Sequence, residues 1–206
     1  MSILDLYAEL LKDRERFIDE VFEAEIYKLA CPRLTVVDVG AYRGEFGFYC
    51  LPFADKIYCI EPDPHPYASL IEYIKDFGLE DKVSSFPIAL SNKNGPRVLY
   101  ASGYGGSSLQ GEDHVSAGNK EIKVDTLTLN SFLTQNGIEF VDILKIDVES
   151  SEGEILLADD IEPALARVKL IIGEDHGCGE IVRKVLERNG FEVNFKAGLF
   201  WGRKNK

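Results

Sequence analysis

The ten residues from Thr35 to Gly44 restrict the fold more than any other stretch of the chain. They begin with the run Thr-Val-Val-Asp-Val, which is short, β-branched and mostly apolar, as in a strand that is covered on both faces of a sheet. Gly40 follows directly, Gly44 comes four residues later, and residues 45–51 can form a helix. A strand, a glycine turn and a helix bring backbone N–H groups and a helix N-terminus against a ligand, although an ordinary βα turn has the same order.

A second strand that ends in an acid favours a nucleotide as this ligand. Residues 56–60 are typical of a buried strand, Glu61 follows them at 21 residues after Gly40, and Pro62 ends the strand. In a nucleotide-binding βαβ unit, the acid at the end of the second strand accepts hydrogen bonds from a ribose diol. The spacing therefore predicts a ligand with an adenosine group, bound by Glu61.

The residues of the glycine turn favour S-adenosylmethionine over NAD. The pattern G-x-G-x-x-G requires a glycine where this chain has Tyr42. Asp38, two residues before the first glycine, suits a ligand that carries an amine or another cation. S-adenosylmethionine has a ribose diol for Glu61 and an α-ammonium group for the region of Asp38. We therefore predict a methyl donor as cofactor, with an NAD-binding oxidoreductase as the alternative.

The length and net charge of the chain restrict the number of domains and the classes of partner that it can have. A chain of 206 residues fits one methyltransferase-sized α/β domain at 33–206, preceded by a helical segment at 1–32. The formal net charge of −12 argues against a nucleic-acid partner. No signal peptide or membrane-spanning apolar run is visible, so we expect a cytoplasmic protein without a membrane partner.

Two segments outside the strand–helix alternation are expected to face a substrate or a partner. Apolar residues at spacings of three and four predict a helix over residues 3–29. This helix can pack on the sheet, cover the active site or form a homodimer contact. Residues 102–119 are rich in Gly and Ser, which favours a mobile loop over the substrate.

Charged residues at the ends of two later strands are the catalytic candidates. The strand at 141–149 carries Lys145, Asp147 and Glu149 on one side, which is costly unless they pair or face a ligand. For Lys145 a structural pair with a carboxylate is the alternative. The strand at 168–174 likewise ends in Glu174, with His176 two residues later. Ligands bind at this end of open α/β sheets, so we expect these acids and the histidine to be functional.

The order of the elements predicts a Rossmann-like α/β sheet. A third strand at 83–90 should flank the adenine near Ala89. Strands at 191–195 and 198–201 should close the chain as an antiparallel pair. Such an ending fits a methyltransferase sheet better than that of a dehydrogenase.

In combination, these motifs resemble the FkbM family of S-adenosylmethionine-dependent methyltransferases over roughly residues 34–193. The matching residues are Asp38-Val39-Gly40-Ala41 with Gly44, Glu61-Pro62-Asp63-Pro64, Gly106-Ser107-Ser108-Leu109, Thr126-Leu127-Thr128-Leu129, Lys145-Ile146-Asp147-Val148-Glu149 with Glu152, and Glu174 with His176. The resemblance implies a class I methyltransferase fold with a seven-stranded, mostly parallel sheet. It also implies O-methylation of a sugar or another small hydroxylated metabolite. This chain has Ser150 where the family usually has Gly, and Tyr42 where the family usually has Asn.

The predicted site has a cofactor end and a catalytic end. The cofactor-binding candidates are Asp38, Gly40, Ala41, Tyr42, Gly44, Glu61, Pro62, Ala89 and Asp147, and the catalytic candidates are Asp147, Glu149, Glu174 and His176. A base must remove the hydroxyl proton: His176 has the most suitable unperturbed pKa, and Asp147 lies nearest the expected methyl group. A carboxylate–histidine group can alternatively hold Mg²⁺, but we assign no residue as a metal ligand. A catalytically silent methyltransferase-like binding domain remains a further alternative.

Overall fold

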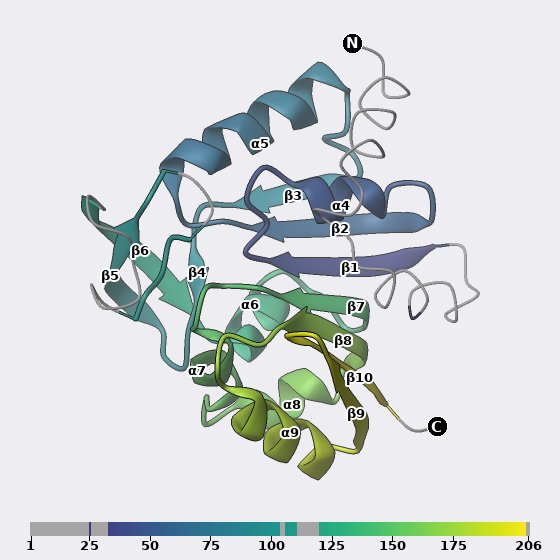
Figure 1. Ribbon diagram of the computed structural model, residues 1–206. Coiled ribbons are helices and arrows are strands. Elements are labelled where there is room, and N and C mark those ends of the chain that lie inside the picture. The colour runs from purple at the N-terminus through teal and green to yellow at the C-terminus, as the bar shows by residue number, and fades with distance from the viewer. Residues whose placement is uncertain (1–24, 26–32, 104–105, 111–119, 205–206) are drawn as a thin grey trace.

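Seven strands form the central sheet, in the order β3-β2-β1-β7-β8-β10-β9 (Figure 1). This computed structural model describes residue 25 and residues 33–103, 106–110 and 120–204. The strands are β1 Leu34–Val39, β2 Ala54–Ile60, β3 Val83–Phe86, β7 Val141–Ile146, β8 Val168–Glu174, β9 Phe191–Lys196 and β10 Leu199–Lys204. β10 is antiparallel to β8 and β9, and the other pairs are parallel. The predicted Rossmann-like α/β fold with an antiparallel C-terminal hairpin is confirmed.

Helices cover both faces of this sheet (Figure 1). One face packs against α4 Glu45–Tyr49 and α5 Pro64–Asp76, and the other against α6 Leu129–Gln135, α7 Glu152–Leu156, α8 Ile161–Leu165 and α9 Gly179–Arg188. Neighbouring residues of β1 alternate between the two apolar cores: Val36 joins the core on the α4 face, and Val37 and Val39 join the other. Burial on both faces explains why the first strand is apolar throughout. It also places Asp38 on the α4 face, because Asp38 lies two residues after Val36.

A separate three-stranded sheet, called here the small sheet, lies beside the carboxyl ends of the central strands. It consists of β4 Ala89–Leu90, β6 Lys120–Leu127 and β5 Gly95–Ala101, in that order, with β5 and β6 antiparallel. The single strand predicted at 83–90 is therefore wrong: its residues are divided between β3 and β4. Pro87 lies at the division, and its lack of an N–H group interrupts the ladder of the central sheet.

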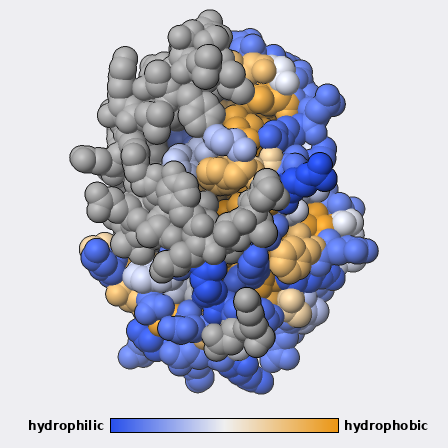
Figure 2. All heavy atoms as spheres, turned by 90° about the vertical axis from the view of Figure 1, so that its right-hand side faces the viewer, coloured by the Kyte–Doolittle hydropathy of each residue, from blue (hydrophilic) through white to orange (hydrophobic). Residues whose placement is uncertain are grey.

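Several sequence predictions concern residues that the structure does not describe. The helix at 3–29, the segment 1–32 and the homodimer contact lie outside the described residues, apart from Glu25, which forms an ion pair with Arg203 at 2.9 Å. Most of the loop at 102–119 also lies outside them. None of the described helices is both long and apolar enough to cross a membrane. Figure 2 shows the end of the molecule at the right of Figure 1, where hydrophilic side chains cover most of the described surface and apolar ones gather near its middle.

Candidate functional site

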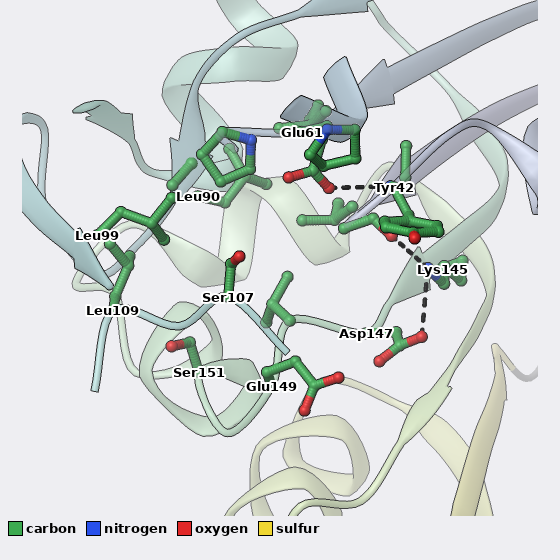
Figure 3. Close-up of a pocket in the computed structure, with 18 of the residues that line it drawn as sticks. Tyr42, Glu61, Leu90, Leu99, Ser107, Leu109, Lys145, Asp147, Glu149 and Ser151 are labelled. Carbon is green, nitrogen blue, oxygen red and sulfur yellow. Dashed lines mark hydrogen bonds and ion pairs between the residues drawn. The ribbon is translucent and has the colours of Figure 1, made fainter. Parts of the chain in front are cut away.

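A cavity of about 240 Å³ opens at the carboxyl ends of β1, β2 and β7, next to the small sheet (Figure 3). Ligands of open α/β sheets bind at this end. The cavity brings together most of the residues that were predicted to bind a cofactor, namely Gly40, Ala41, Tyr42, Glu61, Pro62, Ala89 and Asp147, together with the catalytic candidate Glu149. The other predicted residues, Asp38, Gly44, Glu174 and His176, do not line it.

The glycine turn is fixed by contacts that leave no room for a side chain at Gly40. Gly40 has a φ of +76°, and a Cβ atom there would overlap with the backbone oxygen of Asp147. The N–H groups of Gly40 and Ala41 both donate to the backbone oxygen of Ile60 at 3.0 Å. The turn is thus attached to the end of β2, and these donors are not free for a ligand. Gly44 serves packing instead, since its Cβ would lie 2.7 Å from Leu70 Cδ1.

Two backbone hydrogen bonds fix the buried side chain of Glu61 in the cavity. Its residue is 7% exposed, and each carboxylate oxygen accepts one backbone hydrogen bond: Oε2 from the Tyr42 N–H at 2.9 Å and Oε1 from the Asp63 N–H at 2.8 Å. Burial raises the pKa of Glu61 to about 8, although these two hydrogen bonds oppose the shift. Each oxygen of a carboxylate has two lone pairs. One acceptor position per oxygen therefore remains for a ligand with two adjacent hydroxyl groups.

Lys145 connects the glycine turn to both nearby acids. Its Nζ lies 3.5 Å from Asp147 Oδ2 (Figure 3). It also lies 3.2 Å from Asp38 Oδ1 and donates to the Gly40 backbone oxygen at 2.7 Å. Burial lowers the pKa of Lys145, but the charges of Asp38 and Asp147 outweigh burial and raise it. Asp38 is fully buried and also accepts the Gly47 N–H at 3.2 Å. The structural pair considered for Lys145 is therefore present, and Asp38 acts on the cavity only through this lysine.

A group of acids surrounds His176 beside the cavity. The His176 Nδ1 atom lies 2.9 Å from Glu152 Oε1, and its Nε2 atom lies 3.6 Å from Glu149 Oε2 and 3.9 Å from Glu174 Oε1. The hydrogen bond to Glu152 raises the pKa of His176 to about 9, with burial opposing and the acid charges assisting. At neutral pH the ring is therefore a cation, not a free base. Asp147, Glu149 and His176 each offer one potential metal-ligand atom, and these atoms lie within 4.8 Å of one another.

Glu152 is the buried residue that holds His176 in place, and the sequence analysis predicted no role for it. It is fully buried at the start of α7, and besides His176 it accepts the Val148 N–H at 3.0 Å. One buried carboxylate thus holds both the segment after β7 and the segment after β8. The sequence offered one indication of a role for Glu152, namely its position in the motif that resembles the FkbM family.

A short segment, called here the Ser107–Ser108 bridge, joins the two ends of the cavity. The Ser107 hydroxyl donates to Asp63 Oδ2 at 2.6 Å, two residues after Glu61. The Ser108 hydroxyl donates to the Glu149 backbone oxygen at 2.6 Å, on the side of Asp147 and Glu149. The sequence predicted a loop over the substrate here but not these two hydrogen bonds. They join residues that are separated by 44 and by 41 positions in the sequence.

The contact between Arg97 of β5 and Glu154 of α7 ties the small sheet to the main body. These two side chains form an ion pair, and Gln110, just after the bridge, donates to the same carboxylate at 2.8 Å. The wall that Leu99 and Leu109 form on this side of the cavity is therefore held in place by polar contacts.

Two residues that depart from the family pattern have left-handed backbone conformations. Tyr42 has a φ of +51° and Ser150 a φ of +76°. Asn and Gly, the residues usual in the family, tolerate this region better than other residues do. Both positions thus combine a left-handed backbone with a side chain that disfavours it.

Comparison with known proteins identifies the family. The model of the methyltransferase FkbM domain matches residues 38–193. The 2-O-methyltransferase NoeI of Sinorhizobium fredii is 26% identical over 141 residues, covering 61% of this chain and 57% of NoeI. The AMB antimetabolite synthetase AmbE of Pseudomonas aeruginosa is 26% identical over 226 residues, covering 89% of this chain and 10% of AmbE. The chain therefore spans less than two thirds of the length of either relative.

Solved structures agree with the fold. The methyltransferase FkbM from Methylobacillus flagellatus superposes with a TM-score of 0.58 at 12% identity, covering 82% of this chain and 43% of that one. TrmK of M. capricolum, solved with S-adenosyl-homocysteine, gives a TM-score of 0.52 at 12% identity, covering 92% of this chain and 70% of that one. At these identities the likeness concerns the fold alone. Because the family model extends from the end of β1 into β9, the chain belongs to the FkbM methyltransferase family.

Proposed function

We propose that the protein is an S-adenosylmethionine-dependent O-methyltransferase that acts on a hydroxyl group of a small metabolite, such as a sugar. The observation that carries this proposal is the Glu61 carboxylate, which is fixed by two backbone donors and retains one acceptor position on each oxygen. This arrangement matches a ribose diol. Family membership and the name of NoeI, a 2-O-methyltransferase, support the reaction.

The residues of the cavity fit this cofactor chemically. Glu61 would hold the ribose, and the apolar side chains of Ile60 and Leu90 would contact the adenine. When bound, S-adenosylmethionine supplies a methyl group on a positively charged sulfur atom. The carboxylates of Asp147 and Glu149 line the same cavity and favour such a cation.

Asp147 is our candidate for the group that orients and deprotonates the acceptor. Its side chain is 34% exposed at the cavity, and only Oδ2 faces Lys145 in an ion pair. Oδ1 is therefore the atom that can accept the hydroxyl proton and make the acceptor oxygen a better nucleophile. His176 suits this task less well at neutral pH, because it is already protonated.

Binding and turnover test the proposal separately. Calorimetric titration should detect S-adenosylmethionine and S-adenosyl-homocysteine but not NAD. Release of S-adenosyl-homocysteine should then be measured across a panel of sugars and other hydroxylated metabolites. Binding of NAD in place of S-adenosylmethionine would refute the cofactor assignment, and binding without turnover on any acceptor would favour a silent binding domain.

The variant Asp147→Asn tests the catalytic residue, with Asp159→Asn at an exposed position as the matched control. Turnover of Asp147→Asn should fall by about 10²–10⁴, the usual contribution of a positioned base. Stability should change by less than about 1 kcal/mol, because Lys145 keeps Asp38 and the lost pair is partly exposed. Normal turnover in a folded Asp147→Asn variant would exclude Asp147 as the base.

A further inference from the structure

We propose that Asp147, Glu149 and His176 form a binding site for a divalent cation of the Mg²⁺ or Mn²⁺ type at the catalytic end of the cavity. The inference deepens the proposed function, because a cation there would contact the acceptor oxygen. It rests on the position of three ligand atoms, the orientation of the histidine, the charges around it and a hydroxyl in the cavity that has no partner among the described residues.

The spacing of the ligand atoms suits one ion. Octahedral coordination at about 2.1 Å places neighbouring ligand atoms about 3.0 Å apart and opposite ones about 4.2 Å apart. The three candidate atoms lie within 4.8 Å of one another, and His176 Nε2 is 3.6 Å from Glu149 Oε2. Asp147 and Glu149 have side chains that are 34% and 42% exposed, so small rotations can close the remaining gaps. Figure 3 shows both carboxylates on the same edge of the cavity.

The histidine ring is oriented as a metal ligand would be, and an ion bound at Nε2 would displace the proton that this nitrogen carries at neutral pH. Its Nδ1 atom is held at 2.9 Å by Glu152, which is fully buried and fixed by the Val148 N–H. Nε2 is therefore the nitrogen that faces Glu149 and Glu174. Histidine ligands of metals are commonly held by a carboxylate at the second ring nitrogen, which sets the tautomer and the ring position.

The charge of this region favours an added cation. Three acids, Asp147, Glu149 and Glu174, lie near the Nε2 atom of His176. A fourth acid, Glu152, contacts its Nδ1 atom. Lys145 is already occupied by Asp38 and the Gly40 oxygen and approaches Asp147 only at Oδ2, which leaves Oδ1 for an ion. Carboxylate oxygens suit both Mg²⁺ and Mn²⁺, and Mn²⁺ accepts an imidazole nitrogen more readily than Mg²⁺ does, so Mn²⁺ is the ion to test.

A buried hydroxyl indicates that the same cavity holds a polar ligand. Ser151, two residues after Glu149, is 2% exposed and lines the cavity. Its Oγ atom has no hydrogen-bond partner among the residues that the structure describes. Buried polar groups are almost always paired, so this hydroxyl calls for a ligand such as the acceptor or an ion-bound water. With a cation in place, Asp147 Oδ1 would hold the ion and not take the proton itself: the ion would lower the pKa of the bound hydroxyl, and the proton would pass to solvent water.

Titration with Mn²⁺, followed by the paramagnetic resonance signal of the free ion, tests the site without any turnover. Wild-type protein should bind Mn²⁺ saturably at one site. Glu149→Gln should bind it at least tenfold more weakly, and Glu152→Gln about 10- to 100-fold more weakly through loss of the histidine's orientation. Glu180→Gln, at an exposed position of α9, is the matched control and should bind as the wild type does.

Each outcome bears on the inference. Absence of saturable binding, or equal binding by the wild type and a folded Glu149→Gln variant, would overturn it. If Glu152→Gln does not fold, His176→Gln together with the partly exposed Glu149→Gln decides the question. Calorimetry with S-adenosylmethionine in the presence of EDTA separates the two proposals. Cofactor binding without Mn²⁺ binding would refute only the cation site, and Mn²⁺ binding without cofactor binding would refute only the proposed function.

Discussion

Lowering the pH should release an adenosine ligand from the cavity, because Glu61 must be ionised to accept hydrogen bonds from both ribose hydroxyl groups. Burial raises the pKa of Glu61 from 4.5 to about 8 in the ligand-free protein. A ligand that binds only the ionised form loses affinity about tenfold for each pH unit below this value. Between pH 9 and pH 6 the affinity should therefore fall by about 100-fold, or about 2.7 kcal/mol.

The same shift has the opposite sign for the stability of the ligand-free protein. Between pH 4.5 and about 8, the native carboxyl group retains a proton that the unfolded chain has lost. The contribution of Glu61 to stability is therefore present at low pH and is lost as the pH rises through this window. Ligand binding should counteract the loss at high pH, since the ionised carboxylate then gains two donors.

Calorimetry with 5′-methylthioadenosine at constant ionic strength is the appropriate assay. This ligand has the ribose diol but lacks the amino and carboxyl groups of S-adenosylmethionine, so their titration does not enter. A 2′,3′-dideoxy analogue should bind weakly at every pH, and Glu61→Gln should bind weakly with a flat profile. A flat profile for the wild type, or an equal slope in Glu61→Gln, would refute the role of Glu61.

Three further predictions concern the segments around the cavity. Gly40→Ala should lose about 3 kcal/mol or more of unfolding free energy in urea, because its Cβ would overlap with the backbone oxygen of Asp147; a loss below about 1 kcal/mol would contradict this contact. Ser150→Gly should gain about 1 kcal/mol in the same assay by relieving a φ of +76°, and an unchanged midpoint would argue against strain there. Ser108→Ala should lose about 1–3 kcal/mol and raise the KM for the acceptor, since the Glu149 backbone oxygen loses its donor; an unchanged KM would show that the bridge does not shape the acceptor end.

The features that depend on neighbouring residues could be predicted from the sequence. The apolar run of β1, the turn at Gly40 and the acid at the end of β2 follow one another within 27 residues, from Thr35 to Glu61, and the βα geometry brings them together. The antiparallel pair of strands expected at 191–195 and 198–201 is present as β9 and β10. The fold class and the residues that meet at Glu61 in the cavity therefore follow from local patterns.

Contacts across the sheet could not be predicted in this way. Asp38 was expected at the ligand, but its partner depends on the register of β1 with β7, which places Asp38 beside Lys145. The pKa of His176 depends on Glu152, a residue 24 positions away. No periodicity in a single sequence reports such pairs, because each strand or helix can shift against its neighbour without changing its own pattern.

The separation of the small sheet from the central sheet has a consequence for the divergence of such proteins. β4, β5 and β6 share no ladder with the seven central strands, yet Leu99 and Leu109 on this side form one wall of the cavity. We therefore expect relatives to differ most in the described residues after β4, which can change this wall of the cavity while Leu90 of β4 keeps its place in the core beside Val39 and Ile60. The polar contacts that such a change must preserve include the Arg97–Glu154 pair, the hydrogen bond from Gln110 to Glu154 and the two serines of the bridge.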